Sequence, residues 1–323
     1  MKQIFRTSLA LLAITATIGC EHKQATPGDI PGSMAPQNSI YHWKTVFDID
    51  STETAFLQEQ DIDRIYLRMF DVATEPDFLN GTTEIVPIAT TRFASPIPSD
   101  VEIVPVTYIT TDALRAMPGR ETEIASLIVE RLLAMSSFNE CGKIKEIQFD
   151  CDWTASTKET YSRLCQAAKD TLQPRGVELG ITVRLHQLRE SPPPADRGVL
   201  MLYNTGALKN PGTYNSILHI DDVRPYLGAN EYPIPLDYAY PTFGWGVKFK
   251  DNKFVSIVSY DEKETADNGH IRYERPTAQE VLEVKELVEK RIGKPQRRNI
   301  LYHLDHSQLK HYTNDEISQI LSF

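Results

Sequence analysis

The sequence predicts a single (β/α)8 barrel, the TIM-barrel fold, over residues 40–323. Three observations support this prediction. Short runs of β-branched and aromatic residues alternate with helical patterns, which indicates repeated βα units and a parallel sheet. The strand-like runs number eight, the count that closes such a barrel. A domain of about 280 residues is also long for one fold unless that fold is a barrel.

The expected strands follow one another along the whole domain. They are residues 42–49, 63–72, 101–110, 144–153, 178–188, 198–206, 235–243 and 299–305. Amphipathic helices are expected at 119–138, at 154–172 and at 277–293, with a short final helix within 306–323. Thr277 caps the third of these helices and Gly293 ends it.

Residues 247–262 interrupt the barrel pattern after the seventh expected strand. Apolar residues alternate on both sides of Asp251-Asn252, which is typical of a β-hairpin with a tight turn. We interpret this hairpin as an insertion that lies over the mouth of the barrel.

Residues 1–19 have the pattern of a bacterial lipoprotein signal peptide. Lys2 and Arg6 precede an apolar run that is too short for a comfortable membrane span. The sequence TIGC resembles a lipobox, although Thr17 stands where leucine is usual, so Cys20 is expected to become the first mature residue and to carry lipid such as palmitate. An ordinary signal peptide cut elsewhere is the alternative. Residues 20–39 are rich in Pro, Gly, Ser and Gln, the composition of a flexible tether.

These features predict a lipid-anchored protein of the bacterial cell envelope, in the outer membrane, with the periplasmic or surface face left open. No later segment is apolar for long enough to span a bilayer. The net charge of −10 and the lack of a basic stripe argue against a nucleic-acid partner. Cys141, Cys151 and Cys165 lack metal-ligand spacing, so neither a metal nor another cofactor is expected, and at most one disulfide could form.

Polar residues occupy alternate positions on three of the expected strands. Asp150 and Asp152 share one face of the fourth strand, Arg184 and His186 share one face of the fifth, and Arg68 lies on the second. We expect these faces to converge inside the barrel, near its C-terminal mouth. An isolated buried charge costs several kcal/mol, so the aspartates should find the arginines or the histidine as partners.

Paired carboxylates at a barrel mouth suit glycoside hydrolysis. That reaction needs one protonated carboxyl group as acid, and another as base, nucleophile or charge stabiliser. Asp152, which is nearer the mouth, is the stronger catalytic candidate, with Asp150 in support. A further carboxylate could come from Asp237, Asp71 or Asp305. The alternative is that Asp150 forms a buried ion pair with a structural role only.

Aromatic and polar side chains at or just past the strand ends could bind sugar rings and their hydroxyl groups. The predicted ligand-binding residues are Arg68, Trp153, Arg184, His186, Asn204, Tyr238, Tyr240 and Trp245. Tyr203 and Phe243 lie at strand ends as well. Any single aromatic residue is more often part of a core, so it is their repeated position that favours a site.

The segments EIQFDCDWTAS, VLMLYNTGAL and PLDYAYPTFGWGV together resemble lipoproteins of Bacteroides-type bacteria that contain a glycosidase-like TIM barrel. The fourth expected strand is also similar to the D-x-x-D-x-D-x-E motif of chitinase-type glycosidases. Asp150 and Asp152 match its last two aspartates, whereas Ile147 replaces the first and Thr154 stands where that family has its acidic glutamate. The resemblance therefore implies the barrel but not that family's acid.

Two functions follow from the sequence. One is a lipid-anchored glycoside hydrolase, or a related carbohydrate-active enzyme, with Asp150 and Asp152 at its centre. The other is a non-catalytic barrel that binds glycans or takes part in envelope assembly. A second carboxylate across an open cleft from Asp152 would favour hydrolysis, whereas aspartates occupied by Arg68 and Arg184 would favour a structural role.

Overall fold

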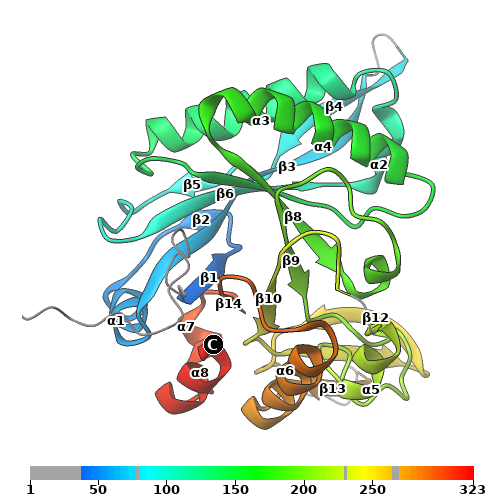
Figure 1. Cartoon of the computed structure of the whole chain (residues 1–323). Coiled ribbons are helices and arrows are strands. Elements are labelled where there is room, and N and C mark those ends of the chain that lie inside the picture. Colours follow the sequence, from blue (N-terminus) through cyan, green and yellow to red (C-terminus); the bar gives the residue numbers. More distant parts are fainter. Residues whose placement is uncertain (1–37, 78–80, 229–230, 264–268) are drawn as a thin grey trace, which may run out of the picture. The chain divides into compact units, whose positions relative to one another are not determined.

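Eight parallel strands close into a barrel in the computed structural model, which describes residues 38–77, 81–228, 231–263 and 269–323 (Figure 1). Each strand pairs with the next in the order given, and the last pairs with the first. In this order they are β1 (Asn38–His42), β3 (Ile62–Asp77), β6 (Glu102–Ile109), β7 (Glu146–Asp150), β8 (Glu178–Arg184), β9 (Arg197–Met201), β10 (Leu236–Pro241) and β14 (Asn299–Tyr302). The predicted (β/α)8 barrel is confirmed.

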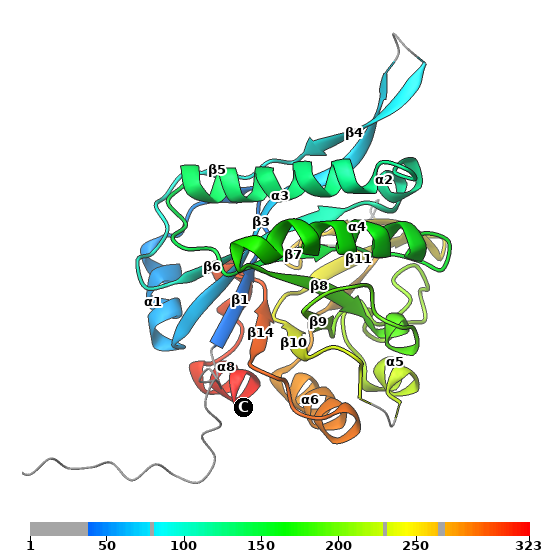
Figure 2. The same cartoon turned by 45° about the horizontal axis from the view of Figure 1, so that its top comes forward.

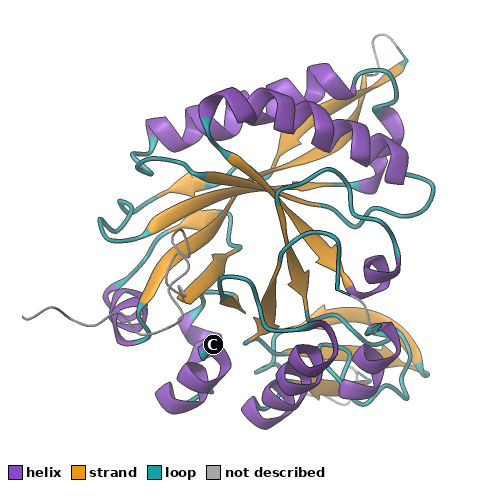
Figure 3. Ribbon diagram, viewed as in Figure 1, coloured by secondary structure: helices purple, strands orange, loops and turns teal. Residues whose placement is uncertain are grey.

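Helices cover the outer face of the barrel (Figure 3). They are α1 (Ser51–Glu59), α2 (Thr111–Ala116), α3 (Glu121–Phe138), α4 (Lys158–Leu172), α5 (Ile220–Val223), α6 (Ala278–Ile292), α7 (His306–Leu309) and α8 (Asn314–Leu321). The predicted cap of α6 is present, since the Thr277 hydroxyl accepts from the backbone N–H of Glu280 and the Glu280 carboxylate accepts in return.

Three connections between barrel strands, those after β3, β8 and β9, lack a full helix. After β3 the chain turns back as β4 (Thr82–Ile88), which pairs antiparallel with the extended end of β3 and projects from the barrel (Figure 2). Short strands β2 (Val46–Phe47) and β5 (Arg92–Phe93) pair beside it. After β8 there is only a turn of 3₁₀ helix, η2 (Leu185–Arg189). Another, η1 (Gln173–Arg175), extends α4, and a third, η3 (Arg224–Tyr226), extends α5.

The first strand corrects the sequence prediction. We expected it at 42–49, after a tether that ended at residue 39, but β1 begins at Asn38 and ends at His42. Pairing with β3 on one side and β14 on the other fixes this short strand, although its own sequence is only weakly strand-like. The predicted signal at 1–19, Cys20 and the tether as far as residue 37 lie outside the described residues.

The predicted hairpin after the seventh barrel strand is confirmed. It consists of β11 (Trp245–Lys250) and β12 (Lys253–Val258), and β13 (His270–Glu274) adds a third antiparallel strand to β11. Asp251 and Asn252 have φ angles of 52° and 58°, as the turn of a tight two-residue hairpin requires.

Inside the barrel, the N-terminal ends of the strands carry a buried network of ion pairs, here called the charged floor. It consists of Arg64, Glu146, Arg197, Asp237 and Arg298, each at most 2% exposed. Arg64 Nη1 lies 3.0 Å from Glu146 Oε2, and Arg197 Nη2 lies 3.2 Å from Asp237 Oδ2. Because buried charges are tolerated only when paired, this network fixes how the strands meet at that end.

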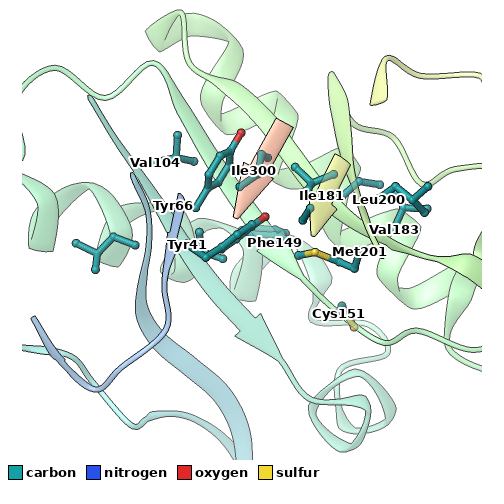
Figure 4. Close-up of a cluster of buried hydrophobic side chains, with 14 of the residues drawn as sticks. Tyr41, Tyr66, Val104, Phe149, Cys151, Ile181, Val183, Leu200, Met201 and Ile300 are labelled. Carbon is teal, nitrogen blue, oxygen red and sulfur yellow. The ribbon is translucent and has the colours of Figure 1, made fainter. Parts of the chain in front are cut away.

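Above the charged floor, the interior becomes aromatic and neutral. The ring of Tyr41 stacks on Tyr66 at 4.8 Å between centroids, and its hydroxyl donates to Gln148 Oε1 at 2.7 Å across the barrel. Figure 4 shows both tyrosines in one buried cluster with Ile300 and Phe149. This layer separates the charged floor from the polar groups at the opposite, C-terminal mouth.

Within the described ranges, none of the helices is both long enough and apolar enough to cross a membrane. Cys141, Cys151 and Cys165 are buried free thiols. In the part of the chain that the structure describes, no cluster of three or more His, Cys, Asp or Glu side chains is placed to hold a metal ion.

Candidate functional site

The C-terminal ends of β7, β8 and β9 surround a pocket of about 280 Å³ at the barrel mouth, here called the mouth pocket. Its lining residues are Asp152, Arg184, Leu185, His186, Met201, Tyr203, Asn204, Thr205 and Tyr226. Four predicted site residues, Asp152, Arg184, His186 and Asn204, therefore lie together. Their convergence follows from the parallel barrel, in which the carboxyl ends of all strands meet at one face.

Arg184 binds both aspartates at the mouth pocket. Its Nε donates to Asp152 Oδ1 at 2.5 Å, and its Nη2 lies 3.5 Å from Asp150 Oδ1. Asp150 also accepts from the Thr182 hydroxyl at 2.6 Å and is buried, whereas the side chain of Asp152 is 46% exposed. Asp152 is thus the aspartate that a ligand in the pocket can reach.

Burial and neighbouring charges shift the pKa values of Asp150, Arg184 and Tyr108 at the mouth. Burial raises the pKa of Asp150, the neighbouring Arg184 charge opposes that rise, and the Asp152 charge adds to it. Burial alone would lower the pKa of Arg184, but Asp150, Tyr203 and Asp152 raise it. Burial, followed by the charges of Asp152 and Asp150, raises the pKa of Tyr108 to about 12. Arg184 therefore remains a cation throughout the physiological pH range.

A line of aromatic rings, here called the aromatic row, crosses the mouth beside the pocket. It consists of Trp43, Tyr302, Tyr203, Phe243 and Trp245. Neighbouring centroids are 5.8 Å apart for Trp43 and Tyr302, 4.4 Å for Tyr302 and Tyr203, and 5.3 Å for Phe243 and Trp245. Both tryptophans and Tyr302 are partly exposed. Aromatic faces exposed beside polar groups suit a ligand that has both apolar faces and hydroxyl groups.

Arg68, the remaining predicted mouth arginine, lies at the Trp43 end of the aromatic row. Its guanidinium group is 5.7 Å from the Trp43 ring centroid. Its Nε donates to Asp71 Oδ1 at 2.8 Å and its Nη2 pairs with the other oxygen of that carboxylate. Arg68 thus pairs with Asp71 and not, as we expected, with Asp150 or Asp152.

At the other end, Glu274 fixes Trp245. Its Oε2 accepts from Trp245 Nε1 at 2.8 Å and from the Ser216 hydroxyl at 2.5 Å, while Oε1 accepts from Arg272 Nε at 2.6 Å. Arg272 in turn donates to the carbonyl of Asn210. The three-stranded sheet thereby holds both the indole ring and the loop that follows β9.

Four predicted site residues lie away from the mouth, which corrects the sequence interpretation. Asp237 is the second residue of β10 and belongs to the charged floor, at the opposite end of the barrel. Tyr238 and Tyr240 point out of the barrel, and the hydroxyl of Tyr238 donates to the carbonyl of Gly293 after α6. Trp153 is 2% exposed, and its ring lies beside Lys158 at the start of α4.

Two residues of the aromatic row were not predicted from the sequence. Trp43 follows β1, which we had placed too late, and Tyr302 ends β14. The two-residue period could have found Tyr302, because it alternates with Ile300 and Arg298 on the interior face. Thr154, at the position of the missing glutamate, is exposed and its hydroxyl bonds to that of Ser156 at 3.0 Å.

Comparison with solved structures agrees with the (β/α)8 barrel fold. The spore cortex-lytic enzyme SleL of Bacillus megaterium QM B1551 matches with a TM-score of 0.56 and 14% identity, over 90% of this chain and 75% of that chain. The GH18 chitinase ChiB from the chitin utilization locus of Flavobacterium johnsoniae matches with a TM-score of 0.54 and 12% identity, over 88% of this chain and 94% of that one.

A chitinase from Chromobacterium violaceum ATCC 12472 is similar as well, with a TM-score of 0.53 and 13% identity over 88% of this chain and 99% of that one. At such identities the likeness concerns the fold alone. No protein-family model matches the chain, and no curated protein matches its sequence.

Proposed function

We propose that this protein binds a polysaccharide or oligosaccharide at the mouth of its barrel and holds it without cleaving it. The observation that carries this proposal is the aromatic row beside a mouth pocket whose two aspartates share one arginine. Stacking surfaces and hydrogen-bonding groups for a sugar are present together. The solved structures with this fold include chitinases and a spore cortex-lytic enzyme, which supports a glycan as the ligand.

Binding is favoured over hydrolysis because the carboxylates at the mouth are engaged. Arg184 pairs with Asp150 and Asp152, and Arg68 pairs with Asp71. Hydrolysis needs a carboxyl group that delivers a proton to the leaving oxygen, and Thr154 occupies the position of that acid in the similar motif. One observation favours hydrolysis as a second candidate: the raised pKa of Asp150, since a carboxyl group that keeps its proton can act as an acid.

We expect Trp43→Ala and Trp245→Ala each to weaken glycan binding by about fivefold or more, because tryptophan is enriched among the contact residues whose truncation costs over about 1 kcal/mol. Titration calorimetry of the purified protein with chito-, cello- and xylo-oligosaccharides measures this. Phe138→Ala, an 87% exposed aromatic at the end of α3, is the matched control and should bind normally.

The same panel separates binding from hydrolysis. Unchanged oligosaccharides after long incubation are expected for the wild-type protein. Release of reducing sugar that disappears in Asp152→Asn would overturn the binding proposal in favour of the hydrolase. If neither binding nor release occurred with any glycan, carbohydrate recognition itself would be excluded.

We further propose that Cys20 carries lipid and anchors the protein in the outer membrane of a bacterial cell, as in the Bacteroides-type lipoproteins that the sequence resembles. The support is the charged start, the short apolar run and the TIGC sequence before a tether-like segment. The anchor would keep the glycan-binding barrel at the cell envelope.

Cys20→Ser is expected to abolish incorporation of an alkyne-tagged palmitate and to move the full chain from the membrane fraction to the soluble fraction. Gel fluorescence and fractionation of expressing bacteria measure both. Cys141→Ser, which leaves Cys20 in place, is the control and should still incorporate the tagged palmitate. Labelling that persists in Cys20→Ser would show that lipid, if present, is attached elsewhere.

A further inference from the structure

A second cavity of about 470 Å³ adjoins the mouth pocket, here called the side groove. Among its lining residues are Leu188, Arg189, Pro225, Tyr226, Leu227 and Tyr232. Tyr226 lines both cavities, so the side groove and the mouth pocket adjoin at this side chain. It passes from the mouth toward Ile292 at the end of α6.

The short elements of this part of the barrel account for the side groove. This part of the barrel has only η2, the four-residue α5 and η3, whereas the long helices α3, α4 and α6 cover other connections. η2 contacts η3, and α5 contacts α6. Figure 2 shows α5 and α6 as neighbours on this part of the barrel.

Tyr226, at the junction of the two cavities, is held in place by Arg189. The Arg189 guanidinium group lies 5.3 Å from the Tyr226 ring centroid, and its Nη2 donates to the Pro225 carbonyl at 2.5 Å. Farther along, the Tyr232 hydroxyl is buried and has no hydrogen-bond partner among the described residues. Two aromatic side chains and a cation beside one cavity are the kinds of groups that recognise a sugar ring and its hydroxyls.

The volumes of the two cavities indicate how long a ligand the site can hold. The mouth pocket alone, at about 280 Å³, falls just below the roughly 300–1,000 Å³ of ordinary ligand clefts. The side groove, at about 470 Å³, is the larger of the two. A ligand confined to the mouth would leave the larger of the two adjoining cavities unused.

We propose that the side groove binds further sugar residues of the same chain that occupies the mouth pocket, so that the ligand is a glycan chain of several residues. This inference rests on the proposed function and specifies its ligand. Arg189, Tyr226 and Tyr232 form the extended part of the site, and affinity grows with chain length until the groove is filled.

Titration calorimetry of the wild-type protein with chito- and cello-oligosaccharides from the dimer to the octamer tests this. We expect affinity for one series to rise by about tenfold or more between the shortest and the longest member. Tyr232→Ala, at a position that lines the groove and not the mouth pocket, should remove most of that rise and leave dimer binding unchanged. Arg175→Ala, a solvent-exposed arginine before β8, should keep the full rise.

The outcomes separate this inference from the proposed function. Affinity that is independent of length, or a Tyr232→Ala effect equal for dimers and octamers, would overturn the side groove and leave glycan binding at the mouth intact. Failure of every oligosaccharide to bind the wild-type protein would overturn both. Tyr232→Phe, which keeps the ring and removes only the buried hydroxyl, is the matched control and should keep most of the rise.

Discussion

Arg184→Met is expected to lower the free energy of unfolding by about 3–5 kcal/mol at pH 7, because it leaves a buried carboxylate without its cation. Asp150 is almost fully buried, and the Arg184 side chain is only 18% exposed, so solvent does little to replace the lost partner. Asp152 contributes less to this loss, since its carboxylate can turn toward water. Urea denaturation followed by circular dichroism measures the change.

The loss in free energy of unfolding caused by Arg184→Met should become smaller as pH falls. Burial already raises the pKa of Asp150 above its ordinary value, and removal of the arginine raises it further. A carboxyl group with a raised folded-state pKa takes up its proton in the folded protein first, so stability increases as pH falls through that pKa. The difference between variant and wild type should therefore shrink between neutral pH and the ordinary Asp pKa of about 3.9.

The double variant Arg184→Met with Asp150→Asn provides the control. Removing the buried charge together with its partner should recover a large part of the lost stability, whereas Arg184→Met with Asp152→Asn should recover little. Equal recovery by the two double variants would contradict the unequal burial of the two aspartates. An Arg184→Met protein as stable as the wild type would mean that Asp150 is neutral at pH 7.

Local sequence signals predicted the elements that depend mainly on their own residues. The hairpin around Asp251-Asn252 and the α6 helix between Thr277 and Gly293 have such signals in the turn and the caps. β1 lacks them, because its place is decided by pairing with strands distant in sequence. The antiparallel β3–β4 extension was likewise not predicted, because it depends on strand pairing and has no local sequence signal of its own.

Site residues were predicted correctly where two rules were used together: the C-terminal ends of parallel strands meet at one face, and alternate residues of a strand point to the same side. Asp152, Arg184 and His186 were placed at the C-terminal mouth in this way, and the mouth pocket brings them together. Trp153 follows Asp152 directly, so the two-residue period alone puts it on the opposite face. The arginine partners could not be predicted, because whether Arg184 or Arg68 reaches the aspartates depends on side-chain packing across the barrel.

Asp237 shows why the position along a strand matters as much as the face. It lies on the interior face, as a catalytic residue should, but at the second residue of β10, which is the N-terminal end. In parallel barrels that end serves stability, while the C-terminal end carries the site. Its Oδ1 accepts the backbone N–H groups of Arg297 and Arg298 at 2.8 and 3.1 Å, a structural pattern of bonding.

Asp237→Asn should therefore destabilise the protein by about 3–5 kcal/mol and leave glycan affinity of the folded fraction unchanged. The substitution keeps Oδ1 as an acceptor but replaces Oδ2, which lies 3.2 Å from Arg197 Nη2 and 3.3 Å from Arg298 Nε. Two buried cations would then face an amide in place of a carboxylate. Urea denaturation and calorimetry on the same preparation measure the two effects.

Asp170→Asn, on the exposed face of α4, is the matched control and should change the free energy of unfolding by no more than about 0.5 kcal/mol. If Asp237→Asn instead kept full stability and lost glycan binding or cleavage, Asp237 would act on the ligand, contrary to its place in the charged floor. Loss of stability with intact binding would show that the two ends of this barrel have different roles. Buried ion pairs hold the strands together at the N-terminal end, and the arginine-bound aspartates and the aromatic row face the ligand at the C-terminal end.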